Sequence, residues 1–254
     1  MPSLRHFRAY IMADGEKLPE YKVQLENNGN TVRCWVPSVV GQEFSIHWND
    51  TARVSETAGY VYVDGEHVGG RFIRPSDHDG HVFLESRPLD AYTTATFKFG
   101  SMVLTDEENE VEAANVVQEL GSIRIMIKEG TIGGMYNHEY REVAQKPVNE
   151  RMKKVGGHRV VLGKQRSAPQ TWRQFHPFKT EPMTFIFQYT SADFLKASNI
   201  AQAPGYEPSR SSRSSCSTRS SCSSRSSRSS ASYKEHCQER GYWVQRPRFV
   251  GRGR

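Results

Sequence analysis

The sequence predicts an all-β fold: an antiparallel β-sandwich of about ten short strands with one or two short helices, plus a disordered C-terminal tail. Three observations lead to this prediction. Segments that alternate apolar and polar residues recur through residues 1–200, a period typical of half-buried strands. Asx-Gly pairs stand between several of these segments, and such pairs supply the positive φ angles of two-residue hairpins. After residue 200 both patterns stop, so we expect a β-sandwich-like domain over 1–200 and a basic Arg/Ser-rich tail over 201–254.

Each predicted strand is an alternating segment next to turn residues. Asp14-Gly15, Asn28-Gly29 and Asp64-Gly65 mark tight turns, and Gly69-Gly70 indicates a bulge or a close backbone approach. Pro37 cannot donate to a β-ladder, so we expect it to end its strand. The predicted strands are Phe7–Ala13, Tyr21–Glu26, Thr31–Val36, Phe44–Trp48, Tyr60–Val63, His67–Ile73, Thr93–Phe99, Ser122–Lys128, Arg159–Leu162 and Thr184–Tyr189.

Helix is scarce in the sequence. Ser191–Asn199 is predicted as a short helix with Ser191 as its N-cap. Asn149–Val155 is expected to form one short turn or two, and the acidic stretch Asp106–Glu119 is expected to be a loop or a short surface helix.

Charge separates the two predicted parts. Residues 1–200 contain 23 Lys and Arg against 25 Asp and Glu, whereas residues 201–254 contain 11 against 3. The body is therefore close to neutral and the tail carries +8, which is typical of a basic arm attached to a domain. Nothing resembles a secretory leader or a membrane-spanning segment. We therefore expect an intracellular protein, cytoplasmic or nuclear and not secreted.

The tail contains seven triplets over Arg210–Ser230, each headed by Arg or Cys and completed by Ser-Ser or Ser-Thr. No apolar residue within them could repay the entropy lost on ordering. Five Arg-Ser dipeptides predict phosphorylation at Ser211, Ser214, Ser220, Ser226 and Ser229. Each phosphate would add about −1.5 to −2 charges, so full modification would cancel or reverse the charge of the tail. The alternative is that the repeat arose by slippage and has no selected role.

A series of short stretches in the body resembles a known family. The stretches are Leu18–Tyr21, Cys34–Val36, Glu43–Trp48, Gly59–Gly65, Gly69-Gly70, Leu120–Arg124, Gly157–Val160 and Phe185–Tyr189. In this order they resemble an uncharacterised β-rich domain family of basidiomycete fungi, over roughly Phe7–Ile200. The resemblance implies a fungal source and a β-sandwich-like domain. It implies no activity and no catalytic residue.

Two stretches contain residue types that bind metals. His138–Glu142 begins like a zinc metalloprotease helix, but Glu142 stands where the second histidine is required. Asp77–His81 gathers two imidazoles and two carboxylates, yet a closed site needs third and fourth ligands at defined geometry. A polar turn accounts for this segment more simply. We therefore predict no catalytic residues, no cofactor and no metal.

Aromatic residues offer the one predicted binding face. Alternation places Tyr60 and Tyr62 on one face of their strand and Val61 and Val63 on the other. Because the valines suit the core, the tyrosines could serve as a binding face. Core packing is the favoured role of the tryptophans, and Cys34 is expected to be a small buried hydrophobe.

These observations favour a binding or interaction module that is not an enzyme and that carries a phosphorylatable basic tail. An unidentified protein is the expected partner, with weak nucleic-acid binding by the tail and no membrane contact. One alternative is an RNA-associated protein whose tail binds non-specifically. The other is a carbohydrate-active enzyme or lectin-like domain, which would require a carboxylate pair or an aromatic platform at the surface.

Overall fold

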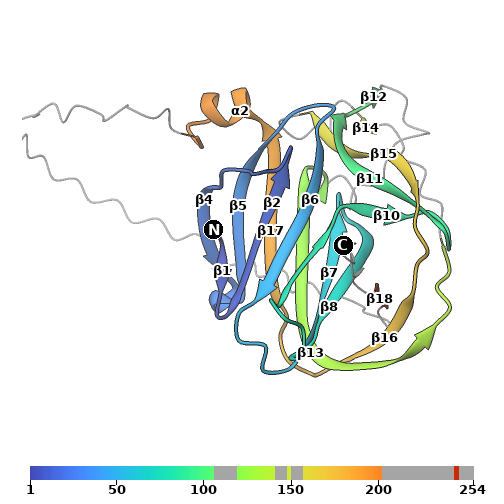
Figure 1. The fold of residues 1–254 in the computed structure, drawn as a ribbon. Helices are drawn as coiled ribbons and strands as arrows, with labels where there is room; N and C mark the ends of the chain where they lie inside the picture. Colours follow the sequence, from blue (N-terminus) through green and yellow to red (C-terminus); the bar gives the residue numbers. More distant parts are fainter. Residues whose placement is uncertain (106–118, 141–147, 150–156, 202–242, 246–254) are drawn as a thin grey trace, which may run out of the picture. The chain divides into compact units, whose positions relative to one another are not determined.

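The computed structural model describes residues 1–105, 119–140, 148–149, 157–201 and 243–245. Their strands form two eight-stranded sheets (Figure 1), and a short two-stranded pair is hydrogen-bonded to neither of them. This arrangement confirms the predicted all-β fold. In the described part of the chain, α2 (Ala192–Ala197) is the α-helix and η1 (Asn27–Gly29) is a 3-10 turn.

The first sheet is built around β6 (Glu43–Asp50), which pairs with β2, β9 and β11. All its pairings are antiparallel. Its other strands are β1 (Ser3–Leu4), β2 (Phe7–Ala13), β3 (Glu16–Lys17), β9 (His81–Leu84), β10 (Ser86–Pro88), β11 (Thr93–Ser101) and β15 (His158–Ser167).

The second sheet is mixed, so the prediction of a wholly antiparallel sandwich was wrong for this sheet. β13 and β17 are antiparallel neighbours, whereas β17 and β5 run parallel. Its strands are β4 (Tyr21–Glu26), β5 (Thr31–Ser38), β7 (Glu56–Val63), β8 (Glu66–Ile73), β13 (Ser122–Tyr136), β16 (Trp172–Pro177), β17 (Met183–Ser191) and β18 (Trp243–Gln245). The separate pair consists of β12 (Leu104–Thr105) and β14 (Val148–Asn149).

All ten predicted strands are present, most of them longer at one or both ends. One detail was wrong: Pro37 does not end β5, which continues to Ser38. Pairing of β5 with β4 stops at Trp35, so Pro37 lies where β5 has β17 on one side only and where one fewer donor is needed. The predicted N-cap is confirmed, since Ser191 Oγ accepts a hydrogen bond of 3.3 Å from Phe194 N.

The main core lies between the two sheets. Phe7, Ile46, Trp48 and Phe97 enter it from the first sheet, and the second sheet contributes Val61, Val63, Ile123, Ile125, Ile127, Phe185 and Phe187. Each of these side chains is almost completely buried. The predicted alternation of the isoleucines in β13 is therefore confirmed, as is the burial of Trp48 and Cys34.

The β7–β8 hairpin confirms the Asx-Gly turn. Asp64 and Gly65 have φ angles of 52° and 85°, the positive pair that a tight hairpin turn requires. Val61 pairs with Gly69 and Tyr62 with His67, so Val68 is the extra residue of a bulge. Gly70 comes so close to β7 that a Cβ there would lie 2.3 Å from the Gly59 carbonyl oxygen. The glycine pair thus marks both a bulge and a close approach.

A second, smaller core lies on the opposite side of β7. It contains Ala58, Tyr60, Phe72 and Phe175. β13 extends past β7 and pairs with β16 over its second half, and β18 pairs with both β16 and β8. The strands β7, β13, β16, β18 and β8 therefore form a closed series of hydrogen-bonded neighbours.

One segment of the predicted disordered tail is instead a strand, β18. Residues 1–201 belong to one compact unit, and β18 belongs to the same unit. Apart from β18, the predicted disordered tail lies outside the described residues, so its disorder stays a prediction. The same holds for almost all of Asp106–Glu119 and, beyond Asn149 in β14, for the predicted turn over Asn149–Val155. No helix among the described residues is long and apolar enough to cross a membrane.

Gly70→Ala is expected to lower the free energy of unfolding by about 1–3 kcal/mol, because the new methyl group would overlap the Gly59 carbonyl. Gly134→Ala is the matched control. Gly134 also lies in a strand, and a Cβ there meets no atom within 4 Å. Urea denaturation should therefore show a change within about 0.5 kcal/mol for the control. Equal losses in the two variants would contradict the close approach.

Candidate functional site

The buried carboxyl of Asp64 organises the region where the two sheets meet. Its Oδ1 accepts hydrogen bonds from Gly121 N at 2.8 Å and from the Tyr189 hydroxyl at 2.5 Å. Its Oδ2 accepts from Val160 N at 2.8 Å. Val160 lies in β15 of the first sheet and Tyr189 in β17 of the second, so one carboxyl group links both sheets to the β7–β8 turn.

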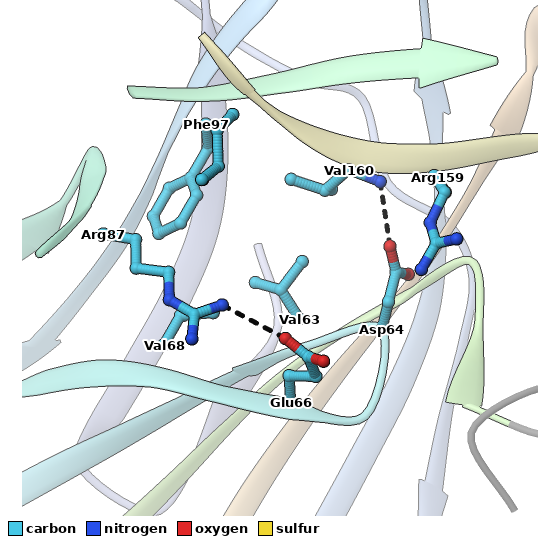
Figure 2. Close-up of a pocket in the computed structure, with 9 residues that line it drawn as sticks. Val63, Asp64, Glu66, Val68, Arg87, Phe97, Arg159 and Val160 are labelled. Atoms are coloured by element: carbon cyan, nitrogen blue, oxygen red, sulfur yellow. Dashed lines mark hydrogen bonds and ion pairs between the residues drawn. The ribbon is translucent and has the colours of Figure 1, made fainter. Parts of the chain in front are cut away.

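A cavity of about 250 Å³ opens beside this carboxyl group (Figure 2). Its apolar wall combines residues of both sheets: Val63, Val68, Phe97, Val160 and Leu162. Its polar groups are Asp64, Glu66, Arg87 and Arg159. Arg87 reaches across from β10 to Glu66 on β8, with 3.1 Å between Nη1 and Oε2.

The bonding of Asp64 makes it a structural group rather than an acid–base catalyst. Desolvation raises the pKa of its carboxyl to about 6, although the hydrogen bonds from Tyr189, Val160 and Gly121 and the charge of Arg159 act in the opposite direction. A carboxyl with such a pKa in a cavity is a natural candidate for proton transfer. Both oxygens are already engaged by protein donors, however, so a substrate would have to displace them.

The predicted tyrosine pair lies around the second core. Tyr60 and Tyr62 do share one face of β7, with Val61 and Val63 on the other. Tyr60 is fully buried beside Phe72 and Phe175, and Tyr62 is half-buried, with Arg124 stacked over its ring at 4.5 Å. The two tyrosine rings therefore do not form an exposed platform on this face.

The Asp77–His81 segment is separated into two environments. Asp77 and Asp79 accept hydrogen bonds from the backbone N–H groups of Arg74 and His81, as expected of a polar turn. His81 itself lies in β9, next to His47 of β6. Within the described residues, no group of three or more His, Cys, Asp or Glu side chains is placed to hold a metal ion.

His81 belongs to a cluster that the sequence did not predict, here called the histidine face: Tyr10, Ser45, His47, His81 and Phe83. These residues come from β2, β6 and β9 of the first sheet. The ring centroids of Tyr10 and His47 are 4.9 Å apart, and those of His47 and Phe83 are 5.2 Å apart. Desolvation and then the neighbouring His81 lower the pKa of His47 to about 4.

A second cavity, of about 220 Å³, adjoins the histidine face. It is bordered by His47 and Phe83 and by three carboxylates, Asp14, Glu43 and Glu85. Arg166 lies 3.6 Å from Glu85, and Gln42 donates to Asp14 at 2.6 Å. Two of the three carboxylates thus already have partners.

In the described part of the incomplete zinc-metalloprotease motif, His138 and Tyr140 contact the side chain of Trp172. His138 stacks on Trp172 with 4.0 Å between ring centroids, and Trp172 Nε1 donates to the Tyr140 hydroxyl at 3.1 Å. Glu142 lies outside the described residues, as do the predicted phosphorylation sites in the tail.

The structure is an all-β domain of two facing sheets joined by the Asp64 clamp, the name used here for the Asp64 carboxyl group with its hydrogen bonds from Gly121, Val160 and Tyr189. The chain belongs to the family described as a domain of unknown function, DUF7918, whose model matches residues 6–203. No curated protein and no solved structure was found to match it. The matched segment contains every strand of the two sheets except β1 and β18.

Asp64→Asn should lower the free energy of unfolding at pH 7 by about 1–3 kcal/mol. Asparagine tolerates the left-handed φ of 52°, so the backbone is not the cause. One carboxyl oxygen becomes an NH₂ group, which sets a donor against the N–H of Val160 or Gly121. Tyr189→Phe, which removes one donor but leaves both oxygens, should cost about 1 kcal/mol. If urea denaturation gives Asp64→Asn the same free energy of unfolding as wild type, the claim that the hydrogen bonds of Asp64 stabilise the fold is contradicted.

The same variant should reveal the titration of Asp64. Because the folded-state pKa is raised to about 6 from 3.8, the folded chain holds a proton that the unfolded chain releases between about pH 4 and pH 6. The contribution of Asp64 is thus fully present below pH 4 and declines as pH rises to 6. We expect the stability of wild type minus Asp64→Asn to fall across this window by up to about 3 kcal/mol. Chemical denaturation at pH 4, 5, 6 and 7 measures it, and a difference that rises with pH would contradict the shift.

Proposed function

We propose that the domain is a protein-interaction module that binds an extended peptide segment between β8 and β16. In this chain the segment is its own β18. The observation that carries the proposal is the pairing of β18 with both neighbours. It is antiparallel to β16 through Trp172, Arg173 and Gln174, and it is parallel to β8 at Arg71.

The position between β8 and β16 is suited to an added strand. Without β18, β8 and β16 would each have one side without a strand partner, and such edges readily pair with another chain. Backbone hydrogen bonds supply affinity for any extended segment, and side-chain contacts select among them. The adjoining second core, with Tyr60, Phe72 and Phe175, provides an apolar lining that such contacts can use.

Energetics favour an occupant that can be exchanged. β18 has three residues, and each backbone hydrogen bond contributes about 1 kcal/mol. Residues 202–242 separate β18 from the rest of its sheet in the sequence, so pairing of β18 closes a loop of about 40 residues. Closing such a loop costs about 3 kcal/mol plus a constant. These two magnitudes are similar. A partner that offers a longer complementary strand could therefore displace β18.

The family match supports the same division of roles. The strands β8 and β16 lie within residues 6–203, whereas β18 lies outside that segment. The site and its occupant are thus encoded in separate parts of the chain, which is the arrangement expected when the occupant can vary. The resemblance to basidiomycete domains supports a second proposal, that the protein comes from a fungus.

The Arg/Ser repeat gives the proposed exchange a means of control. It lies between the domain and β18. Phosphorylation at Ser211, Ser214, Ser220, Ser226 and Ser229 would cancel or reverse the +8 charge of the tail, and so would change how the tail interacts with charged surfaces. A basic tail also supports weak, salt-sensitive nucleic-acid binding, but no contact among the described residues favours RNA as the main partner.

A carbohydrate-directed role is the second candidate. The cavity beside the histidine face combines the carboxylates Asp14, Glu43 and Glu85 with the half-exposed ring of Phe83. Such a combination suits a sugar ring. We place it second because Asp14 and Glu85 already have side-chain partners.

The test uses the full chain and a fluorescent peptide of residues 239–249. Val244→Pro removes a backbone N–H inside β18 and should free the site from its own segment. Val250→Pro makes the same change outside β18 and serves as the control. Fluorescence anisotropy should show that the Val244→Pro chain binds the peptide at least about twofold more tightly than wild type or Val250→Pro, because the similar free energies of strand pairing and loop closure leave about half of the wild-type sites occupied in cis.

Hydrogen exchange supplies an independent measurement. Amides of residues 171–177 should exchange faster in the Val244→Pro chain than in the control, because β16 would lose one neighbour. Peptide binding that is undetectable in the Val244→Pro chain, or equal in all three chains, would contradict the proposal.

A further inference from the structure

We propose that Tyr10, His47 and His81 bind a divalent transition-metal ion of the zinc class on the outer face of the first sheet. The three residues belong to three neighbouring strands, β2, β6 and β9. Tyr10 pairs with His47 across β2 and β6, and His81 pairs with Asn49 across β9 and β6. The sheet register thus brings together side chains that are far apart in sequence.

Two distances between donor atoms, both measured from His81 Nε2, fit one metal ion. His47 Nδ1 and His81 Nε2 are 3.1 Å apart, and the Tyr10 hydroxyl oxygen is 3.3 Å from His81 Nε2. Zinc binds imidazole nitrogen at about 2.0–2.1 Å in tetrahedral geometry, which requires roughly 3.3–3.4 Å between ligand atoms. Both observed separations lie close to this value.

Hydrogen bonds among Tyr10, His47 and His81 explain these short distances less completely than a bound metal ion does. An imidazole nitrogen has either one lone pair or one proton in the plane of the ring. His81 Nε2 has two partners within reach, His47 Nδ1 and the Tyr10 hydroxyl, and can make one good bond to one of them. A cation between the three atoms would accept a lone pair from each of them, with the Tyr10 hydroxyl releasing its proton to solvent as the metal binds.

Ser45 is placed to orient His47. Its Oγ lies 2.7 Å from His47 Nε2. If Nε2 carries the proton and donates to Ser45, the lone pair of Nδ1 faces His81. Metal-binding histidines usually donate their second N–H in this way, and loss of such a partner typically weakens metal binding about 10–100-fold. Ser45 is therefore a positioning residue.

Oxygen atoms and negative charge are also close to the cluster. The negative charge of Asp79 acts on His81. The side-chain carbonyl oxygen of Asn49, the cross-strand partner of His81, is buried and accepts no hydrogen bond within the described residues. The described residues contain no metal-binding group of three or more His, Cys, Asp or Glu side chains. The proposed site is of a different kind, because its third ligand is a tyrosine.

The test is a Co²⁺ titration of the full-length chain after removal of metals with a chelator. Cobalt takes the place of zinc and reports its ligands through visible absorption. We expect the wild-type chain to bind one equivalent with tetrahedral-type bands and without the near-ultraviolet thiolate band that tail cysteines would produce. Calorimetry with Zn²⁺ should give one competing site.

The variants separate this site from other histidines. His47→Asn and His81→Asn should each abolish the site, and Tyr10→Phe should change the spectrum while the two nitrogen ligands remain. Ser45→Ala should weaken binding about tenfold or more. His78→Asn, in the same turn as His81 but outside the cluster, is the matched control and should bind like wild type. Circular dichroism without metal verifies that each variant is folded.

Two results would overturn the proposal. One is a wild-type chain that binds neither Co²⁺ nor Zn²⁺ measurably. The other is unchanged stoichiometry and spectrum in folded His47→Asn and His81→Asn, which would place the metal elsewhere. Loss of binding in these two variants, together with retention in His78→Asn, would support it.

Discussion

A single buried carboxyl group constrains how the two sheets meet. Asp64 occupies a left-handed turn position and accepts hydrogen bonds from Gly121, Val160 and Tyr189. A carboxylate removed from water is costly unless donors surround it, so the β7–β8 turn, β15 and β17 must all reach it in the native fold. The cavity of about 250 Å³ lies directly beside this junction. By positioning these strands, the hydrogen bonds of Asp64 also position the apolar residues that line the cavity and the Glu66–Arg87 ion pair.

Much of the fold could be predicted from the sequence because its signals are local. Alternation within β13 placed Ile123 and Ile125 in the core, and Asp64-Gly65 marked a hairpin turn. The sites could not be predicted, because their contacts join residues far apart in the chain. Asp64 reaches Tyr189 across 125 positions, and His47 reaches His81 across 34. Nothing in the local pattern distinguishes a turn aspartate in water from one buried as a clamp.

The second core explains why Tyr60 was assigned to a binding face. Alternation correctly separates Tyr60 from Val61, but a period of two cannot tell a solvated face from a second buried one. The extension of β13 past β7 creates that second buried face, and β16 and β18 continue it. No residue within β7 carries a signal for this extension. The proposed peptide site adjoins the second core, whereas the histidine face belongs to the other sheet, so the two proposals concern different surfaces.

The parallel pairing of β5 with β17 has a consequence for synthesis of the protein. β17 lies between β5 and β13 in the second sheet. β5, at residues 31–38, pairs locally with β4, but it can pair fully with β17 only after residue 191 has been translated. The early hairpins can form as they leave the ribosome, but the sheet cannot be completed until nearly the whole domain has emerged. Such long-range pairing makes folding slow. During translation, the growing chain thus exposes the edge of β5 for as long as it takes to make the next 150 or so residues.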